Sequence, residues 1–222
     1  MTCVKPENQE FEYVKVLPYV GCNYTRANCW GVTMLVLGES HYMEEGEPGQ
    51  LLDPLFTRDV VGEVLEGVKK PAFNFFTKVA GLFYGGRRPT ENERCEFWRS
   101  VAFYSFVQVC VGNAPRQRPT SEMWHHARQP FKETLRILRP EFVLVLGGDL
   151  AEHLKRMAES ETNVRLGDKY MPAWLYVHAR GNAFAFRINH PSSRGWSYRD
   201  WEPWTQAAVK QAKIQAYDYG AG

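Results

Sequence analysis

Two short polar segments of this sequence carry side chains of the types that perform acid–base chemistry. The first segment, "GESHY", consists of Gly38, Glu39, Ser40, His41 and Tyr42. The second segment, "NHPSS", consists of Asn189, His190, Pro191, Ser192 and Ser193. A carboxylate, imidazoles, hydroxyls and a phenol gathered in one pocket would suit proton transfer to or from a polar substrate.

Each of these segments follows a run of apolar residues that predicts a buried strand. Four such runs occur, at residues 33–38, 101–109, 141–147 and 183–188. Their near-continuous apolar character is typical of strands that are covered on both faces, as in a parallel sheet. Since ligands bind outside the carboxyl ends of such strands, we expect "GESHY" and "NHPSS" to meet at one edge.

Helical patterns fall between the predicted strands, at residues 73–84, 120–139, 149–160 and 200–215. Pro130 should kink or split the second of these helices, and Asp149 is a candidate N-cap for the third. Strands that alternate with helices predict right-handed crossovers. We therefore expect an α/β fold, a three-layer α/β/α domain with a central four-stranded parallel sheet, as a single domain over residues 1–222.

Composition limits the kinds of partner. The 222 residues have a formal net charge of +2, so binding to nucleic acid would require basic residues concentrated on one face. No apolar run approaches the roughly 18 residues of a membrane span. The first residues lack the apolar stretch of a signal peptide, so we expect a cytoplasmic protein that does not contact membranes.

Basic residues do gather around the second polar segment. Residues 181–199 contain Arg187, Arg194 and Arg199 but no carboxylate, together with Trp196 and Tyr198. Arginines and small hydroxyls suit phosphate contacts, and an aromatic side chain can stack on a base or wedge into a duplex. A solvated loop is an equally good interpretation of the same composition.

Two further basic loops lie elsewhere in the chain. The loop at 113–119 contributes Arg116 and Arg118, which we expect beside the same edge of the sheet. For "GGRRP" at 85–89 we prefer a hinge between two helices. The five cysteines form no CxxC pair, and His125 and His126 are adjacent on a predicted helix and so point in different directions. We expect no metal site.

The order of the polar segments resembles the uracil-DNA glycosylase superfamily. "GESHY" is similar to its first motif, G-[QEIM]-x-P-[YG], and "HPSS" is similar to its late motif, H-P-S-[PG]-x-S. Residues 113–148, with Arg118-Pro119-Thr120 and Glu122, resemble the thermophile-type branch. "EPGQ" (47–50), with Phe56 six residues later, and "PAFNFF" (71–76) resemble the uracil-specific branch. Together the matches span residues 33–195.

This resemblance implies a four-stranded parallel sheet between helices and an enzyme that hydrolyses the bond between a base and deoxyribose. The base must be flipped out of DNA before its atoms can be reached. The partner would be DNA, in base-excision repair or in defence against phage DNA with modified bases. The iron–sulfur cysteines of the thermophile-type branch have no counterparts here, so we expect no cluster. We also expect a monomer that needs no cofactor or metal.

The first motif also departs from the superfamily. Ser40 stands where the uracil-specific branch has an aspartate that orients water, and His41 stands where it has a proline. Glu39, His41 or Glu44 could take over this role, and we favour Glu39. The asparagine that reads uracil would fall near 105–107, where none stands. We therefore expect the target to be a modified or damaged base.

The resemblance implies a role for each candidate residue. In the catalytic group, Glu39 positions water or stabilises the sugar's developing charge, and His190 donates a hydrogen bond to the leaving base. The full catalytic set is Glu39, Ser40, His41 and His190. The base pocket comprises Gly38, Tyr42 as its wall, Phe56 as the stacking ring, and Asn189. The DNA-binding residues are Arg116, Arg118, Ser192, Ser193, Arg194 and Trp196, of which Arg194 or Trp196 would fill the gap in the duplex.

Two other function classes fit parts of the pattern. A catalytically inactive DNA-binding protein is favoured by Ser40 at the aspartate position. A serine ester hydrolase would use Ser40 as nucleophile and His190 as base. However, Arg187 stands where such enzymes carry an aspartate, and Tyr42 stands at the last glycine of a G-x-S-x-G motif.

Overall fold

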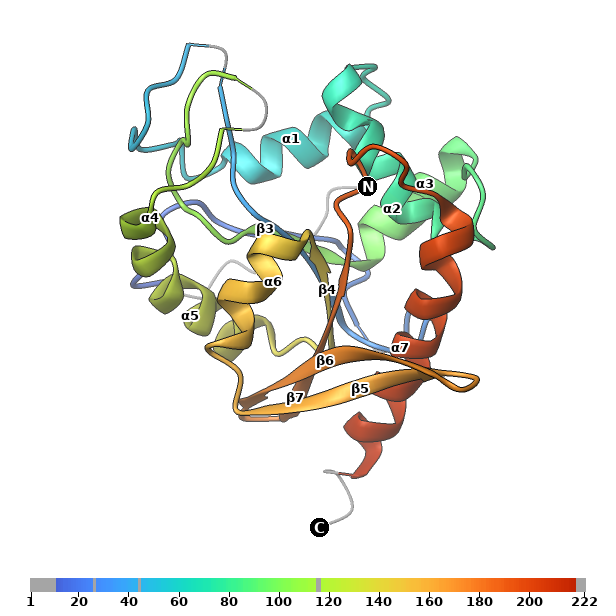
Figure 1. Cartoon of the computed structure of the whole chain (residues 1–222). Helices are drawn as coiled ribbons and strands as arrows, with labels where there is room; N and C mark the ends of the chain where they lie inside the picture. The colour runs from blue at the N-terminus through green and yellow to red at the C-terminus, as the bar shows by residue number, and fades with distance from the viewer. Residues whose placement is uncertain (1–10, 26, 44, 115–116, 219–222) are drawn as a thin grey trace.

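A seven-stranded mixed sheet runs through the protein (Figure 1). The computed structural model describes residues 11–25, 27–43, 45–114 and 117–218. The sheet order is β1-β3-β2-β4-β7-β6-β5. The strands are β1 (Tyr19–Val20), β2 (Met34–Gly38), β3 (Ala102–Ser105), β4 (Phe142–Leu146), β5 (Ser160–Leu166), β6 (Lys169–His178) and β7 (Gly181–Ile188).

The centre of the sheet consists of the four strands that the apolar runs predict. β3, β2, β4 and β7 are adjacent and mutually parallel. The prediction of a sheet limited to four strands is wrong, because β1 pairs antiparallel outside β3, and β6 and β5 continue antiparallel beyond β7. The sequence of β5, "SETNVRL", has no apolar run, and Val164 is its one buried residue. β1 has only two residues.

Helices connect and cover the strands. They are α1 (Phe56–Leu65), α2 (Asn74–Gly81), α3 (Glu91–Ser100), α4 (Ser121–His126), α5 (Arg128–Leu138), α6 (Gly148–Lys155) and α7 (Tyr198–Asp218), with a 3-10 turn η1 (Pro71–Phe73) before α2. The helices predicted at 73–84, 149–160 and 200–215 are confirmed as α2, α6 and α7. The predictions missed α1 and α3.

The pattern at 120–139 splits into α4 and α5, as Pro130 led us to expect. Pro130 lies in the first turn of α5, where its missing N–H has no intrahelical acceptor to lose. The prediction of Asp149 as an N-cap is wrong. Gly147, with φ at 120°, precedes α6, and Asp149 lies within the first turn, where a negative charge suits the helix dipole.

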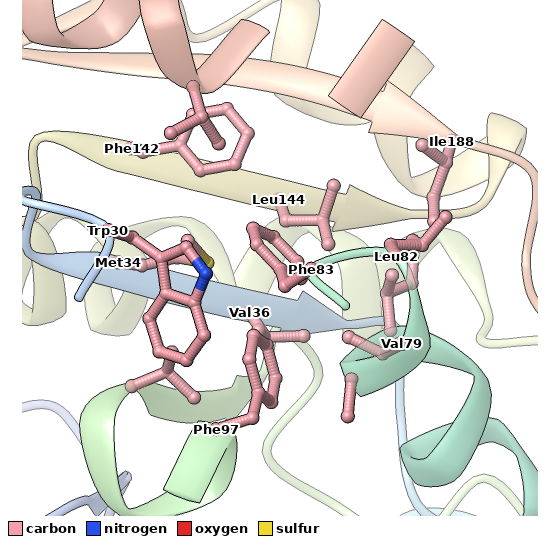
Figure 2. Close-up of a cluster of buried hydrophobic side chains, with 14 of the residues drawn as sticks. Trp30, Met34, Val36, Val79, Leu82, Phe83, Phe97, Phe142, Leu144 and Ile188 are labelled. Atoms are coloured by element: carbon pink, nitrogen blue, oxygen red, sulfur yellow. The ribbon is translucent and has the colours of Figure 1, made fainter. Parts of the chain in front are cut away.

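Alternation along the parallel strands builds two cores, one on each face of the sheet. Met34 and Val36 of β2 point into a core that is closed by α1, α2, α3 and α7 (Figure 2). Leu35 and Leu37 point to the opposite face, where α4, α5 and α6 cover them. Successive side chains of a strand face opposite sides, so burial on both faces requires the apolar runs seen in the sequence. The result is the predicted three-layer α/β/α arrangement.

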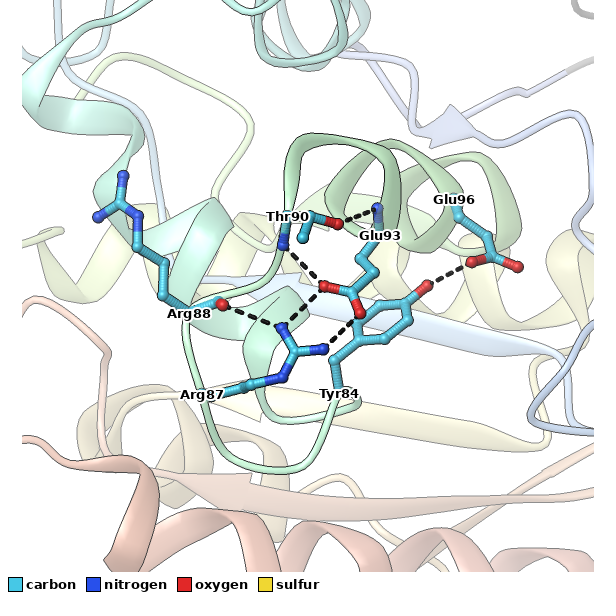
Figure 3. Close-up of polar contacts among 6 residues, drawn as sticks. All are labelled: Tyr84, Arg87, Arg88, Thr90, Glu93 and Glu96. Carbon is cyan, nitrogen blue, oxygen red and sulfur yellow. Dashed lines mark hydrogen bonds and ion pairs between the residues drawn. The ribbon is translucent and has the colours of Figure 1, made fainter.

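The loop at 85–89 connects α2 to α3, which agrees with the interpretation of "GGRRP" as a hinge. Thr90 and Glu93 form a capping box at the start of α3, in which each side chain binds the other residue's backbone N–H. Arg87 donates to both carboxylate oxygens of Glu93 (Figure 3). This ion pair attaches the hinge loop to the first turn of α3.

The first described residues are held by a buried carboxylate on α5. Glu133 accepts hydrogen bonds from the backbone N–H groups of Glu12, Tyr13 and Val14 at 2.8, 2.8 and 2.9 Å. Further along, the side-chain oxygen of Gln108 accepts from Val16 N–H at 2.9 Å. Gln108 follows β3, so this segment is attached close to the carboxyl edge of the sheet.

Candidate functional site

The two polar segments converge on the carboxyl edge of the sheet. Glu39 directly follows β2, and His190 lies two residues after β7. β4 separates the two strands, so β2 and β7 run about 10 Å apart. β4 is followed by Gly147 and Gly148, which add no side chain of their own between β2 and β7. Side chains from β2 and β7 can therefore approach one substrate from two sides.

"GESHY" is an extension of the sheet rather than a free turn. Phe106 N–H donates to the carbonyl of Gly38 at 2.9 Å, and Val107 N–H donates to that of Glu39 at 2.9 Å. Val111 N–H donates to the carbonyl of His41 at 3.0 Å. Pairing to the segment after β3 thus continues past the end of β2, and it fixes the backbone that carries the candidate residues.

Glu39 is a mostly buried carboxylate with a cationic partner. Its side chain is 15% exposed and accepts a hydrogen bond from Arg118 Nη2 at 3.0 Å. The same nitrogen binds the carboxylate of Asp149. Burial raises the pKa of the Glu39 carboxyl above its ordinary value, with Arg118 opposing this shift and Asp149 adding to it.

His190 is held as a neutral imidazole. Its Nδ1 accepts from Ser192 N–H at 3.2 Å, and its ring lies 5.6 Å from that of Phe75. Burial lowers the pKa of His190, and the charges of Arg118 and Lys78 lower it further. Because Nδ1 is an acceptor, the single proton of the neutral ring sits on Nε2, which is then a hydrogen-bond donor.

His41 lies in a different environment, against α1. Its Nε2 is 3.0 Å from the hydroxyl of the buried Thr57, and its ring meets that of Phe56 edge to face at 4.9 Å. Burial lowers the pKa of His41 to about 4. His41 is therefore neutral at pH 7, and its hydrogen bond holds "GESHY" to the first turn of α1.

The other base-pocket candidates differ in exposure. A Cβ on the buried Gly38 would meet the Phe103 ring at 3.3 Å, so glycine permits close packing there. Tyr42 is 41% exposed, and Phe56 is half-buried. Asn189 is exposed, and its Oδ1 accepts from Arg187 at 2.8 Å. Ser40, the remaining candidate in the first segment, is half-buried.

The basic and hydroxyl candidates also fall into distinct settings. Ser192, Ser193 and Arg194 are exposed in the loop after β7. Trp196 is half-buried, with Tyr198 packed against it at 5.0 Å and Lys78 Nζ 5.3 Å above its ring. Arg118 is engaged by two carboxylates. Arg116 and Glu44 lie outside the described residues.

Sequence reasoning missed three residues that shape this site. Asp149 binds Arg118, and Lys78 donates to the carbonyl of Pro191 at 2.7 Å, holding the loop of His190. Phe75 packs beside the His190 ring. Only Asp149 had a signal, because "GGDL" follows a predicted strand at the same edge. Lys78 and Phe75 lie on α2, whose position relative to that edge is a tertiary property.

The described part of the chain contains no group of three or more histidine, cysteine or acidic side chains placed to hold a metal ion. None of its helices combines the length and apolar character needed to cross a bilayer.

Comparison with models of known protein families finds no match to this chain, and comparison with curated proteins finds none either. The functional interpretation therefore depends on the geometry of the site and on the motif resemblance.

Proposed function

We propose that this protein is a monofunctional DNA glycosylase, a divergent relative of the uracil-DNA glycosylase superfamily, acting on a modified or damaged base. The observation that carries the proposal is that Glu39 and His190 follow β2 and β7 at the same edge of the sheet, with β4 between these two strands. The two polar segments thus supply a carboxylate and an imidazole from either side of β4, where Arg118 binds the carboxylate. A carboxylate and a neutral imidazole donor on two sides of a substrate are the groups this reaction requires.

In the proposed reaction, the bond between C1′ of deoxyribose and the base nitrogen breaks. Its electron pair leaves with the base, and positive charge develops on the sugar. The carboxylate of Glu39 stabilises that charge and orients a water molecule, whose oxygen bonds to C1′. The water's released proton balances the negative charge of the departed base.

His190 acts on the leaving group in this proposal. Its Nε2–H would donate to the base as negative charge builds up on it, while Ser192 N–H holds the ring through Nδ1. A preorganised donor of this kind is typically worth about 3–4 kcal/mol of transition-state stabilisation. A neutral ring suits the task because it donates without transferring a full charge.

DNA would be held by the loop after β7. Ser192, Ser193 and Arg194 are exposed there and suit phosphate contacts. Phe56 would stack on the flipped base, with Tyr42 as the pocket wall. Between the two candidates for filling the gap in the duplex, exposure favours Arg194, because Trp196 is already packed against Tyr198 and Lys78.

The test is a panel of single- and double-stranded oligonucleotides carrying uracil, hypoxanthine, alkylated bases and hydroxymethylated or glucosylated cytosine. Alkali-labile abasic sites are the readout. We expect release of at least one base by the wild type, and a loss of about 10²–10³-fold in His190→Ala. The matched control is His126→Ala, since that imidazole is exposed on α4. If no base is released by the wild type, the enzyme proposal fails.

A catalytically inactive DNA-binding protein is the second candidate, favoured by Ser40 at the position of the missing aspartate. It predicts salt-sensitive DNA binding, with no base release from any member of the panel.

A further inference from the structure

One nitrogen of Arg118 serves two carboxylates of unlike exposure. Nη2 binds Glu39, whose side chain is 15% exposed, and Asp149, whose side chain is 71% exposed. Arg118 comes from the segment before α4, Glu39 follows β2, and Asp149 is in the first turn of α6. The three charges thus join three separate elements at the carboxyl edge of the sheet.

We propose that Arg118 and Asp149 are positioning residues for Glu39. Arg118 orients the carboxylate of Glu39, and the two residues have opposite effects on its ionisation. Arg118 holds the carboxylate in its ionised form, and Asp149 weakens that hold by sharing the same nitrogen. This inference deepens the proposed function, on which its meaning for catalysis rests.

The physical basis is the cost of burying a charge. A buried carboxylate without a cationic partner favours its protonated form, which can neither orient water nor stabilise a cation. Arg118 offsets that cost through a charge-assisted hydrogen bond. Asp149 places a second negative charge on the same guanidinium, and so opposes the ionisation of Glu39.

The two neighbouring histidines carry no charge at pH 7, so the ionisation of Glu39 depends mainly on Arg118 and Asp149. His41, two residues along, has a pKa of about 4 because it is buried, and is neutral at pH 7. His190 is also kept neutral, by burial and by Arg118 and Lys78. Lys78 is bound to the carbonyl of Pro191, the residue that follows that imidazole.

The guanidinium of Arg118 is also paired within the protein, with Glu39 and Asp149. A guanidinium that is neutralised by two carboxylates has little charge left to offer a phosphate. Arg118, which the sequence places among the DNA-binding candidates, is thereby assigned to the chemistry of Glu39.

The experiment is a pH titration of the Glu39 carboxyl by carbon-13 NMR in the full chain, with labelled glutamate side chains. Glu39→Gln identifies the resonance. We expect Arg118→Gln to raise the pKa of Glu39 by about one unit or more. Asp149→Asn should lower it. Arg118→Lys, which retains the charge, should keep the pKa of Glu39 below that in Arg118→Gln.

The opposite signs of the two expected pKa shifts of Glu39 distinguish a positioning role from a purely structural one. Both Arg118→Gln and Asp149→Asn break the same ion pair, so a bridge that only stabilises the fold would move the titration in one direction in both variants. Shifts of the same sign, or no shift, would overturn the proposal. Lys155→Gln, which breaks the exposed contact of Lys155 with Glu161 elsewhere on α6, is the control expected to leave Glu39 unchanged.

The titration does not depend on base release, so it tests the positioning role even in a protein that releases no base. Where base release is measured, the acid limb of its pH profile should move with the pKa of Glu39. Failure of the glycosylase proposal and failure of the positioning proposal are therefore distinct results.

Discussion

The guanidinium of Arg118 donates a hydrogen bond to the carboxylate of Glu39 across 3.0 Å, joining residues that are 79 positions apart in the sequence. This contact connects the segment before α4 to the end of β2. The charge of Arg118 also contributes to lowering the pKa of His190, two residues after β7. Arg118 thus acts on one residue from each of the two polar segments.

The first prediction concerns how DNA affinity depends on salt. Arg194 is exposed in the loop after β7, whereas Arg118 is bound to two carboxylates. We expect Arg194→Gln to reduce the slope of log affinity against log salt by about 1, and Arg118→Gln to leave it unchanged. Fluorescence anisotropy with a labelled duplex at several salt concentrations measures both slopes. A reduction of about 1 for Arg118→Gln would show that this residue contacts phosphate.

The second prediction concerns stability in acid. Burial lowers the pKa of His41 to about 4, against an ordinary value of 6.5. Between pH 6.5 and pH 4, His41 is protonated in the unfolded chain but stays neutral in the folded protein. The contribution of neutral His41 to the free energy of unfolding is therefore fully present above pH 6.5, and it is lost as the pH falls towards 4.

Replacement of His41 by glutamine removes this titration and keeps a group able to bond to Thr57 Oγ1. We expect wild type to lose more stability than His41→Gln between pH 7 and pH 4.5. Urea unfolding at the two pH values gives the comparison, and every other acid-sensitive group is shared by the two proteins. Equal losses would contradict a buried neutral His41.

The third prediction concerns the attachment of the N-terminal segment. Glu133 accepts three backbone N–H groups, whose combined effect outweighs burial and holds the pKa of its carboxyl below the ordinary value. Glu133→Gln turns an NH₂ group towards these donors, and we expect a loss of about 2–3 kcal/mol in unfolding free energy. Glu152→Gln, on the exposed side of α6, should change it by less than about 0.5 kcal/mol. Chemical denaturation at pH 7 compares the two variants.

The fourth prediction concerns the capping box of α3. Thr90 accepts from Glu93 N–H at 3.3 Å, so Thr90→Ala leaves a helix-end donor unsatisfied. We expect a cost of about 1 kcal/mol. Arg87→Gln removes an exposed ion pair and should cost less. Thermal unfolding ranks the two variants, and the reverse order would mean that the hinge is held mainly by Arg87 and not by the cap.

Much of the central architecture was predictable because it depends on local pattern. The apolar runs at 33–38 and 141–147 bury side chains on both faces, as is typical of strands inside a covered parallel sheet. The carboxyl-edge rule then placed Glu39 and His190 on one edge without any knowledge of contacts. The strand β5 escaped prediction because only Val164 and Leu166 of its seven residues are apolar, which is too few to form an apolar run.

The sequence by itself determined the order of the four central strands along the chain, the types of residue that follow them, and the edge at which those residues gather. Only the tertiary structure decided which side chains are partners there. Arg118 and Asp149 are 31 residues apart and belong to different elements. Their contact depends on how α6 packs against the sheet, which no local pattern encodes. For the same reason, the pKa shifts of Glu39, His41 and His190 come from burial and from neighbours in the folded chain, and residue type alone does not reveal them.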